Sequence, residues 1–125
     1  MNNKVLIVDD IPDNIDTIKE MIKTFDLDVK TASGGKEAIG MVDSFKPDII
    51  LLDLMMPQVN GWDVIDYVRG RYSKSQMAII VVSLLSNKDN IDECYELGAN
   101  DYITKPIIKA RLTSSLEAHL KSYIA

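Results

Sequence analysis

The sequence predicts an α/β domain built on a five-stranded parallel sheet with helices on both faces. Short apolar runs, such as Ile49–Leu52, alternate along the chain with segments in which apolar residues recur every three or four positions. Parallel strands need crossover connections, and these crossovers are right-handed, so five strands alternating with five helices give one doubly covered sheet. Ligands of such a sheet bind beyond the carboxyl ends of its strands.

The composition narrows the class of protein. The 125 residues, 46% of them hydrophobic and 26% charged, are the size of one domain, and we expect residues 1–125 to form it. The net charge of -5, without a basic cluster, disfavours binding to nucleic acid or to an anionic membrane and favours a protein partner.

Location and redox chemistry are suggested by what the sequence lacks. Cys94 is the only cysteine, so neither a disulfide within the chain nor a cysteine metal cluster is expected. No signal segment opens the chain, and its apolar runs of about four to six residues are far shorter than the roughly 20 that cross a bilayer. We therefore expect a cytoplasmic protein.

The first half of the chain predicts two strands, each followed by a helix. Val5–Val8 is a β-branched apolar run that stops at two aspartates, as a buried strand would. Asp13 or Asn14 can cap the next helix, and after the shorter strand Asp28–Ala32, Ser33 can cap a second helix. The residues expected to face inward are Ile15, Ile18, Ile22 and Phe25 in the first helix, and Ala38, Met41, Val42 and Phe45 in the second.

The second half repeats the alternation three times. The expected elements are the strand Ile49–Leu52, a helix over Trp62–Tyr72, the strand Ala78–Val82, a helix that Asn87 or Asp89 opens and Gly98 ends, the strand Asp101–Thr104, and a helix from Ile107 or Ile108.

Polar side chains stand where these strands end. Asp9 and Asp10 follow the first strand, Asp53 follows the third, Ser83 ends the fourth and Lys105 follows the fifth. Alone, Asp53 would be interpreted as a helix cap or turn residue. Three converging carboxylates, however, need raised pKa values or a cation between them, and oxygen ligands without His or Cys suit Mg²⁺. A lysine and a hydroxyl beside them suit an anionic phosphoryl group.

Four motifs, in this order, resemble the receiver domain of two-component response regulators over the whole chain. They are VLIVDD, LLDLMMP with Gly61 four residues beyond Pro57, VVS, and GANDYITKP. The resemblance, which extends to the chemotaxis regulators, implies a flavodoxin-like doubly wound sheet with strand order 2-1-3-4-5. It also implies a phosphoprotein that carries 4-aspartylphosphate and acts as a switch rather than as a conventional enzyme.

The resemblance further implies a role for each polar residue of the site. Asp53 is expected to accept the phosphoryl group, and Lys105 and Ser83 are expected to hold its oxygens. The metal ligands that it implies for Mg²⁺ are Asp10, Asp53, the backbone carbonyl of Met55 and, through water, Asp9.

The signalling parts and partners are expectations of the same kind. Tyr102 would be the switch aromatic that responds to Ser83, and the Lys105–Pro106 bond would be cis. A histidine kinase or a phosphotransfer protein would donate the phosphoryl group. The last two helices and last strand would present the altered face to a downstream protein or a fused output domain, or in a phosphorylation-dependent homodimer.

Two other functions fit the sequence less well. A haloacid-dehalogenase-like phosphatase needs an Asp-x-Asp pattern where this chain has adjacent Asp9 and Asp10, and flavodoxin-like cofactor binding needs a phosphate loop there. A receiver-fold protein-binding module that works without phosphorylation stays open as the alternative. The reason is Leu84, which follows Ser83 where the family usually has a small residue: it either restricts access to Asp53 or turns away into an apolar patch with Leu85.

Overall fold

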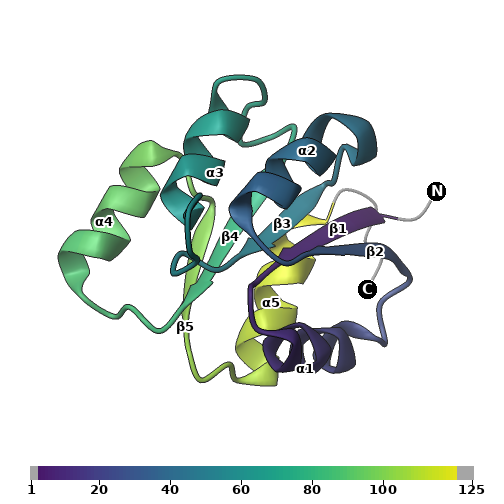
Figure 1. The fold of residues 1–125 in the computed structure, drawn as a ribbon. Coiled ribbons are helices and arrows are strands. Elements are labelled where there is room, and N and C mark those ends of the chain that lie inside the picture. The colour runs from purple at the N-terminus through teal and green to yellow at the C-terminus, as the bar shows by residue number, and fades with distance from the viewer. Residues whose placement is uncertain (1–2, 121–125) are drawn as a thin grey trace.

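The computed structural model describes residues 3–120 and has the predicted alternation of strands and helices (Figure 1). The strands form one parallel sheet in the order β2-β1-β3-β4-β5, which confirms the fold class. The elements are β1 (Asn3–Val8), α1 (Pro12–Ile22), β2 (Leu27–Ala32), α2 (Gly35–Phe45), β3 (Ile49–Leu52), α3 (Gly61–Arg69), β4 (Ala78–Ser83), α4 (Lys88–Leu97), β5 (Asp101–Thr104) and α5 (Lys109–His119).

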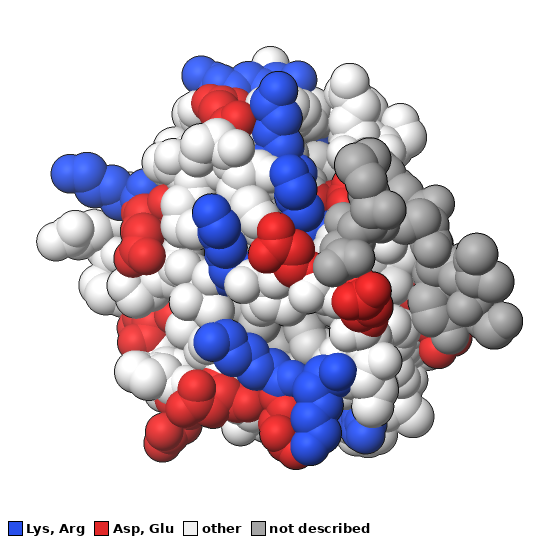
Figure 2. All heavy atoms as spheres, turned by 90° about the vertical axis from the view of Figure 1, so that its right-hand side faces the viewer, with Lys and Arg blue, Asp and Glu red and all other residues white. Residues whose placement is uncertain are grey.

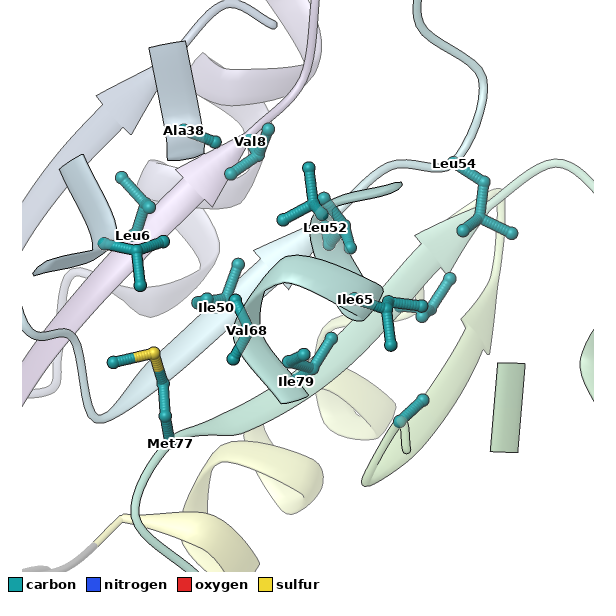
Figure 3. Close-up of a cluster of buried hydrophobic side chains, with 14 of the residues drawn as sticks. Leu6, Val8, Ala38, Ile50, Leu52, Leu54, Ile65, Val68, Met77 and Ile79 are labelled. Atoms are coloured by element: carbon teal, nitrogen blue, oxygen red, sulfur yellow. The ribbon is translucent and has the colours of Figure 1, made fainter. Parts of the chain in front are cut away.

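Helices cover both faces of the sheet, with α1 and α5 on one and α2, α3 and α4 on the other (Figure 1). Because alternate strand residues point to opposite faces, each strand supplies both cores. Leu6 of β1 packs in the core under α2 to α4, which Figure 3 shows with Ile65 and Val68 of α3. Its neighbour Ile7 packs in the core under α1 and α5.

The start of α1 differs from the prediction that Asp13 or Asn14 caps it. The residue before the helix is Ile11, whose side chain makes no capping bond, and Pro12 occupies the first turn. Proline fixes the backbone for a helix start and lacks the N–H that would need a cap. Asn14 lies inside the helix, and its amide donates to the Asp9 carboxylate at 3.4 Å.

The start of α2 also corrects a prediction, because Ser33 does not cap it. Gly34 is the residue before the helix and has no capping side chain. The backbone N–H and hydroxyl of Ser33 both donate to the Glu37 carboxylate, at 3.2 and 2.8 Å. Ser33 therefore acts as a hydrogen-bond donor to Glu37 rather than as the cap of α2.

Helix α3 begins one residue before the prediction and ends three residues earlier. Asn60 and Asp63 form a reciprocal capping box that fixes the start at Gly61. A Cβ at Gly61 would lie 2.6 Å from the Leu54 Cα, so only glycine allows the loop after β3 to pack this closely on the helix.

Helix α4 has the ends that the sequence predicts. The Asn87 side chain accepts from the Asp89 N–H at 2.7 Å, and Gly98 ends the helix with a left-handed φ of 116°. Within residues 3–120, no helix has the length and apolar composition needed to cross a membrane.

Charges on one face of the molecule are mixed. Figure 2, which shows the right-hand side of Figure 1, has lysine and arginine side chains interspersed with aspartate and glutamate. The described residues on this face form no continuous basic surface of the kind that holds a polyanion.

Candidate functional site

The sheet brings the predicted polar residues to one edge. Val8 lies opposite Leu52 in the register of β1 and β3, so the residues that follow both strands emerge side by side. The Asp53 N–H donates to the Val8 carbonyl at 3.0 Å and continues the ladder by one residue. Asp9, Asp10 and Asp53 each place a carboxylate oxygen within 4.8 Å of the others, as the sequence predicts.

Asp9 is the most enclosed of the three carboxylates, with 1% of its surface exposed. Its Oδ1 accepts from the Ile11 N–H at 2.9 Å and from the Asn14 amide at 3.4 Å. Its Oδ2 accepts from Lys105 Nζ at 3.1 Å. Both oxygens are thus already held by protein donors.

Asp10 has the opposite environment. It is half-buried, yet its Oδ1 is buried without a hydrogen-bond partner among the described residues. A buried carboxylate oxygen without a donor is costly unless a cation or water satisfies it. This oxygen therefore marks Asp10 as the carboxylate best placed to bind a metal directly.

Asp53 is 6% exposed and lies between one cation and two anions. Burial raises the pKa of its carboxyl group; Lys105, whose Nζ lies 3.8 Å from Asp53 Oδ2, opposes that rise, and the charges of Asp9 and Asp10 add to it. The Met55 N–H donates to Asp53 Oδ1 at 3.3 Å. A divalent cation between the carboxylates would lower the pKa of Asp53 instead, because it stabilises the ionised carboxylates that otherwise repel one another.

Lys105 and Ser83 are tied together by the backbone. The Lys105 N–H donates to the Ser83 carbonyl at 2.8 Å, and the predicted cis Lys105–Pro106 bond is present. The Ser83 side chain is fully buried, and its Oγ accepts from the Leu85 N–H at 3.2 Å. The Lys105 amine therefore stands next to the carboxylates, and the backbone joins the end of β4, where Ser83 lies, to Lys105.

Tyr102 points inward and is 7% exposed. Its hydroxyl donates to the Leu85 carbonyl at 2.6 Å. The pKa of Tyr102 is raised by burial, and a hydrogen bond with the Ser83 side chain partly opposes that rise. Ser83 and Tyr102 thus both hold Leu85, one at its N–H and the other at its carbonyl.

A cleft of about 520 Å³ opens above Asp53. Its lining residues are Ile11, Asn14, Thr17, Asp53, Met55, Leu84, Lys105, Pro106 and Ile107. Leu84 is 73% exposed and lines this cleft, whereas Leu85 packs against the core. Leu84 therefore does not turn away into a patch with Leu85, which was one of the two alternatives.

Sequence reasoning missed two residues that shape the site. Asn14 orients Asp9, but its place at a helix start favoured a capping role. Leu85 joins Ser83 to Tyr102 through its backbone, and no sequence pattern marks a backbone contact of this kind.

The chain matches a family model described as "Response regulator receiver domain" over residues 5–117. Two curated relatives are each 32% identical to it. The first is a Vibrio cholerae protein named "Probable cyclic di-GMP phosphodiesterase", aligned over 94% of this chain and 26% of that protein. The second is the Bacillus subtilis "Alkaline phosphatase synthesis transcriptional regulatory protein PhoP", aligned over 97% and 50%. The chain thus spans about a quarter and a half of the lengths of these relatives.

A solved structure agrees with this match. The BeF3-activated N-terminal receiver domain of Klebsiella pneumoniae RstA superposes with a TM-score of 0.87 and 32% sequence identity, covering 96% of this chain and all of that one.

Proposed function

Because the chain belongs to the response regulator receiver domain family, we propose that it is the phosphoacceptor switch of a two-component phosphorelay, with Asp53 as the acceptor. The observation that carries this proposal is the cluster of three carboxylates within 4.8 Å, with the Lys105 amine 3.1 Å from Asp9 and 3.8 Å from Asp53. We propose one receiver domain over residues 1–125.

The proposed chemistry is a transfer from phosphohistidine to aspartate. A carboxylate oxygen of Asp53 attacks the phosphorus, the P–N bond to the histidine ring breaks, and the product is an acyl phosphate. Lys105, now paired with Asp9 and Asp53, would turn to the oxygens of the phosphoryl group, and Ser83 would donate its hydroxyl to another. Positioning and charge neutralisation of this kind supply most of the catalysis in phosphoryl transfer. The chain thus assists its own modification but acts as a switch.

Mg²⁺ fits the residues present. The ligand atoms would all be oxygens, and Asp10 Oδ1 is buried without a hydrogen-bond partner in the part of the chain that the structure describes. We propose Asp10, Asp53 and the Met55 carbonyl as direct ligands and Asp9 as a ligand through water, since both Asp9 oxygens already accept hydrogen bonds. When bound, the ion would neutralise charge on the acceptor and on the transferred group.

The proposed switch runs from Ser83 to Tyr102 through Leu85. If Ser83 turns its hydroxyl toward a phosphoryl group on Asp53, the Leu85 N–H loses its acceptor, and the loop that Tyr102 also holds can move. Phosphorylation would then shift an existing equilibrium between two forms of this loop. Tyr102 already lies inward, with 7% of its surface exposed.

The altered face would be the one formed by α4, β5 and α5. We propose a histidine kinase or phosphotransfer protein as donor, and a downstream protein, a fused output domain or a second copy of the chain as the target of this face. The longer relatives support an output beyond the receiver without identifying it.

The proposal is tested by incubating the protein with Mg²⁺ and phosphoramidate and then measuring its mass. We expect a gain of one phosphate in the wild type, none in Asp53→Asn, and an unchanged gain in Asp66→Asn, which alters an exposed residue of α3. No gain in the wild type would favour the alternative, a protein-binding module that works without phosphorylation.

A further inference from the structure

We propose that an apolar collar around the cleft selects phosphoryl donors that leave as a neutral ring, such as the imidazole of phosphohistidine, over small acyl phosphates that leave as carboxylates. This inference rests on the proposed function, because it concerns the donor to Asp53. We define the collar as Ile11, Met55, Leu84, Pro106 and Ile107.

The collar gathers exposed apolar surface at one place. Ile11, Met55 and Leu84 are 50%, 58% and 73% exposed, and they are three of the six large hydrophobic side chains exposed within residues 3–120. They come from three different loops, after β1, β3 and β4, yet all line the cleft above Asp53. Apolar surface that rims a pocket is typical of a binding site.

The side-chain hydrogen-bond donors that line the cleft already have acceptors. The Asn14 amide donates to Asp9, and the Thr17 hydroxyl donates to the Asp13 carbonyl at 2.9 Å. Lys105, the one cation among the residues that line the cleft, is paired with Asp9 and Asp53 at its floor. The collar itself therefore contains no cation that could pair with a departing anion.

The chemistry of the donor decides what meets the collar. When an acyl phosphate reacts, its P–O bond breaks and the electron pair stays on oxygen, so a carboxylate anion departs. When phosphohistidine reacts, its P–N bond breaks and the electron pair stays on that ring nitrogen. With the other nitrogen protonated, the ring departs as neutral imidazole. An unpaired anion is costly among apolar side chains, whereas a neutral ring gains from contact with them.

Leu84 is the residue of the collar that best tests this selection. It is 73% exposed, a larger fraction than that of Ile11 or Met55, so its replacement removes collar surface without opening the core. Leu97 at the end of α4 is a matched control, because it is also an exposed leucine, at 36%, but it does not line the cleft.

The experiment compares phosphorylation rates from three donors at saturating Mg²⁺, followed by mass. N-phosphoimidazole leaves as a neutral ring, phosphoramidate as neutral ammonia without a ring, and acetyl phosphate as an anion. In Leu84→Ala, we expect the rate with phosphoimidazole relative to phosphoramidate to fall about threefold. In Leu84→Lys, we expect the rate with acetyl phosphate relative to phosphoramidate to rise about threefold.

Unchanged ratios in both Leu84 variants would overturn the collar while leaving the acceptor role of Asp53 intact. Equal changes in Leu97→Lys would overturn it as well, since they would show a general effect of charge. A wild-type protein that gains no phosphate from any of the three donors would instead overturn the proposed function.

Discussion

Replacing Asp101 by asparagine should destabilise the protein through a network that fixes β5. The Asp101 carboxylate accepts from both terminal nitrogens of Arg111 at 3.0 and 2.8 Å, from the Ser115 hydroxyl at 2.6 Å and from the Tyr102 N–H at 2.8 Å. Arg111 also donates to the Tyr102 carbonyl at 3.1 Å. The network therefore ties the backbone of Tyr102, the proposed switch residue in β5, to Arg111 of α5.

The size of the effect follows from the ionisation of Asp101, whose side chain is 18% exposed. Burial raises the pKa of Asp101, but the hydrogen bonds from Arg111, Ser115 and the Tyr102 N–H outweigh it and lower the pKa from 3.8 to about 2. Each factor of ten in the dissociation constant is worth about 1.4 kcal/mol, so the ionised form contributes about 2 kcal/mol to stability.

The contribution of Asp101 to the free energy of unfolding depends on pH. A carboxyl group with a lowered folded pKa stabilises the protein fully above its unfolded value of 3.8 and loses that contribution as the pH falls toward 2. Urea unfolding of wild type and Asp101→Asn should therefore differ by about 2 kcal/mol at pH 7, and the difference should shrink between pH 4 and pH 2.

A control variant distinguishes the loss of this network from the loss of an exposed surface charge. Asp92→Asn removes an exposed pair with Lys88, 2.6 Å apart, and should cost much less because exposed pairs within one helix contribute little. If Asp101→Asn costs no more than Asp92→Asn at pH 7, or if its cost is the same at every pH, the reasoning is wrong.

Three further predictions concern the site. Asp10→Asn should weaken Mg²⁺ binding at least about tenfold, and Asp9→Asn less, since the Asp9 oxygens are already held by protein donors; calorimetry that finds equal losses would contradict the ligand assignment. Leu84→Ala should shorten the lifetime of the phosphorylated protein about threefold by admitting water, and a lifetime by mass equal to that of the wild type would exclude such a barrier. Tyr102→Phe removes the 2.6 Å bond to the Leu85 carbonyl and should cost about 1 kcal/mol in urea unfolding; no loss would show that the bond is not formed in solution.

The sequence by itself determined the fold and the place of the site. The alternation of apolar runs with helix-period segments is a local property of the chain. It places a helix between successive strands, and such helical crossovers make the sheet parallel. Because all strands of a parallel sheet end at the same edge, Asp53 and Lys105 were expected together, although they are 52 positions apart in the sequence. The structure confirms this convergence at 3.8 Å.

Only the tertiary structure decided which hydrogen-bond partner each polar side chain has. Asn14 is an acceptable cap by sequence, but the fold places Asp9 within reach of its amide, and Glu37 likewise takes the donors of Ser33. The same competition holds both oxygens of Asp9 and leaves one oxygen of Asp10 without a donor among residues 3–120. No sequence pattern predicts this difference between adjacent residues. The physical reason is that hydrogen bonds and exposure depend on which atoms lie within about 3 Å, and packing between distant segments sets those distances.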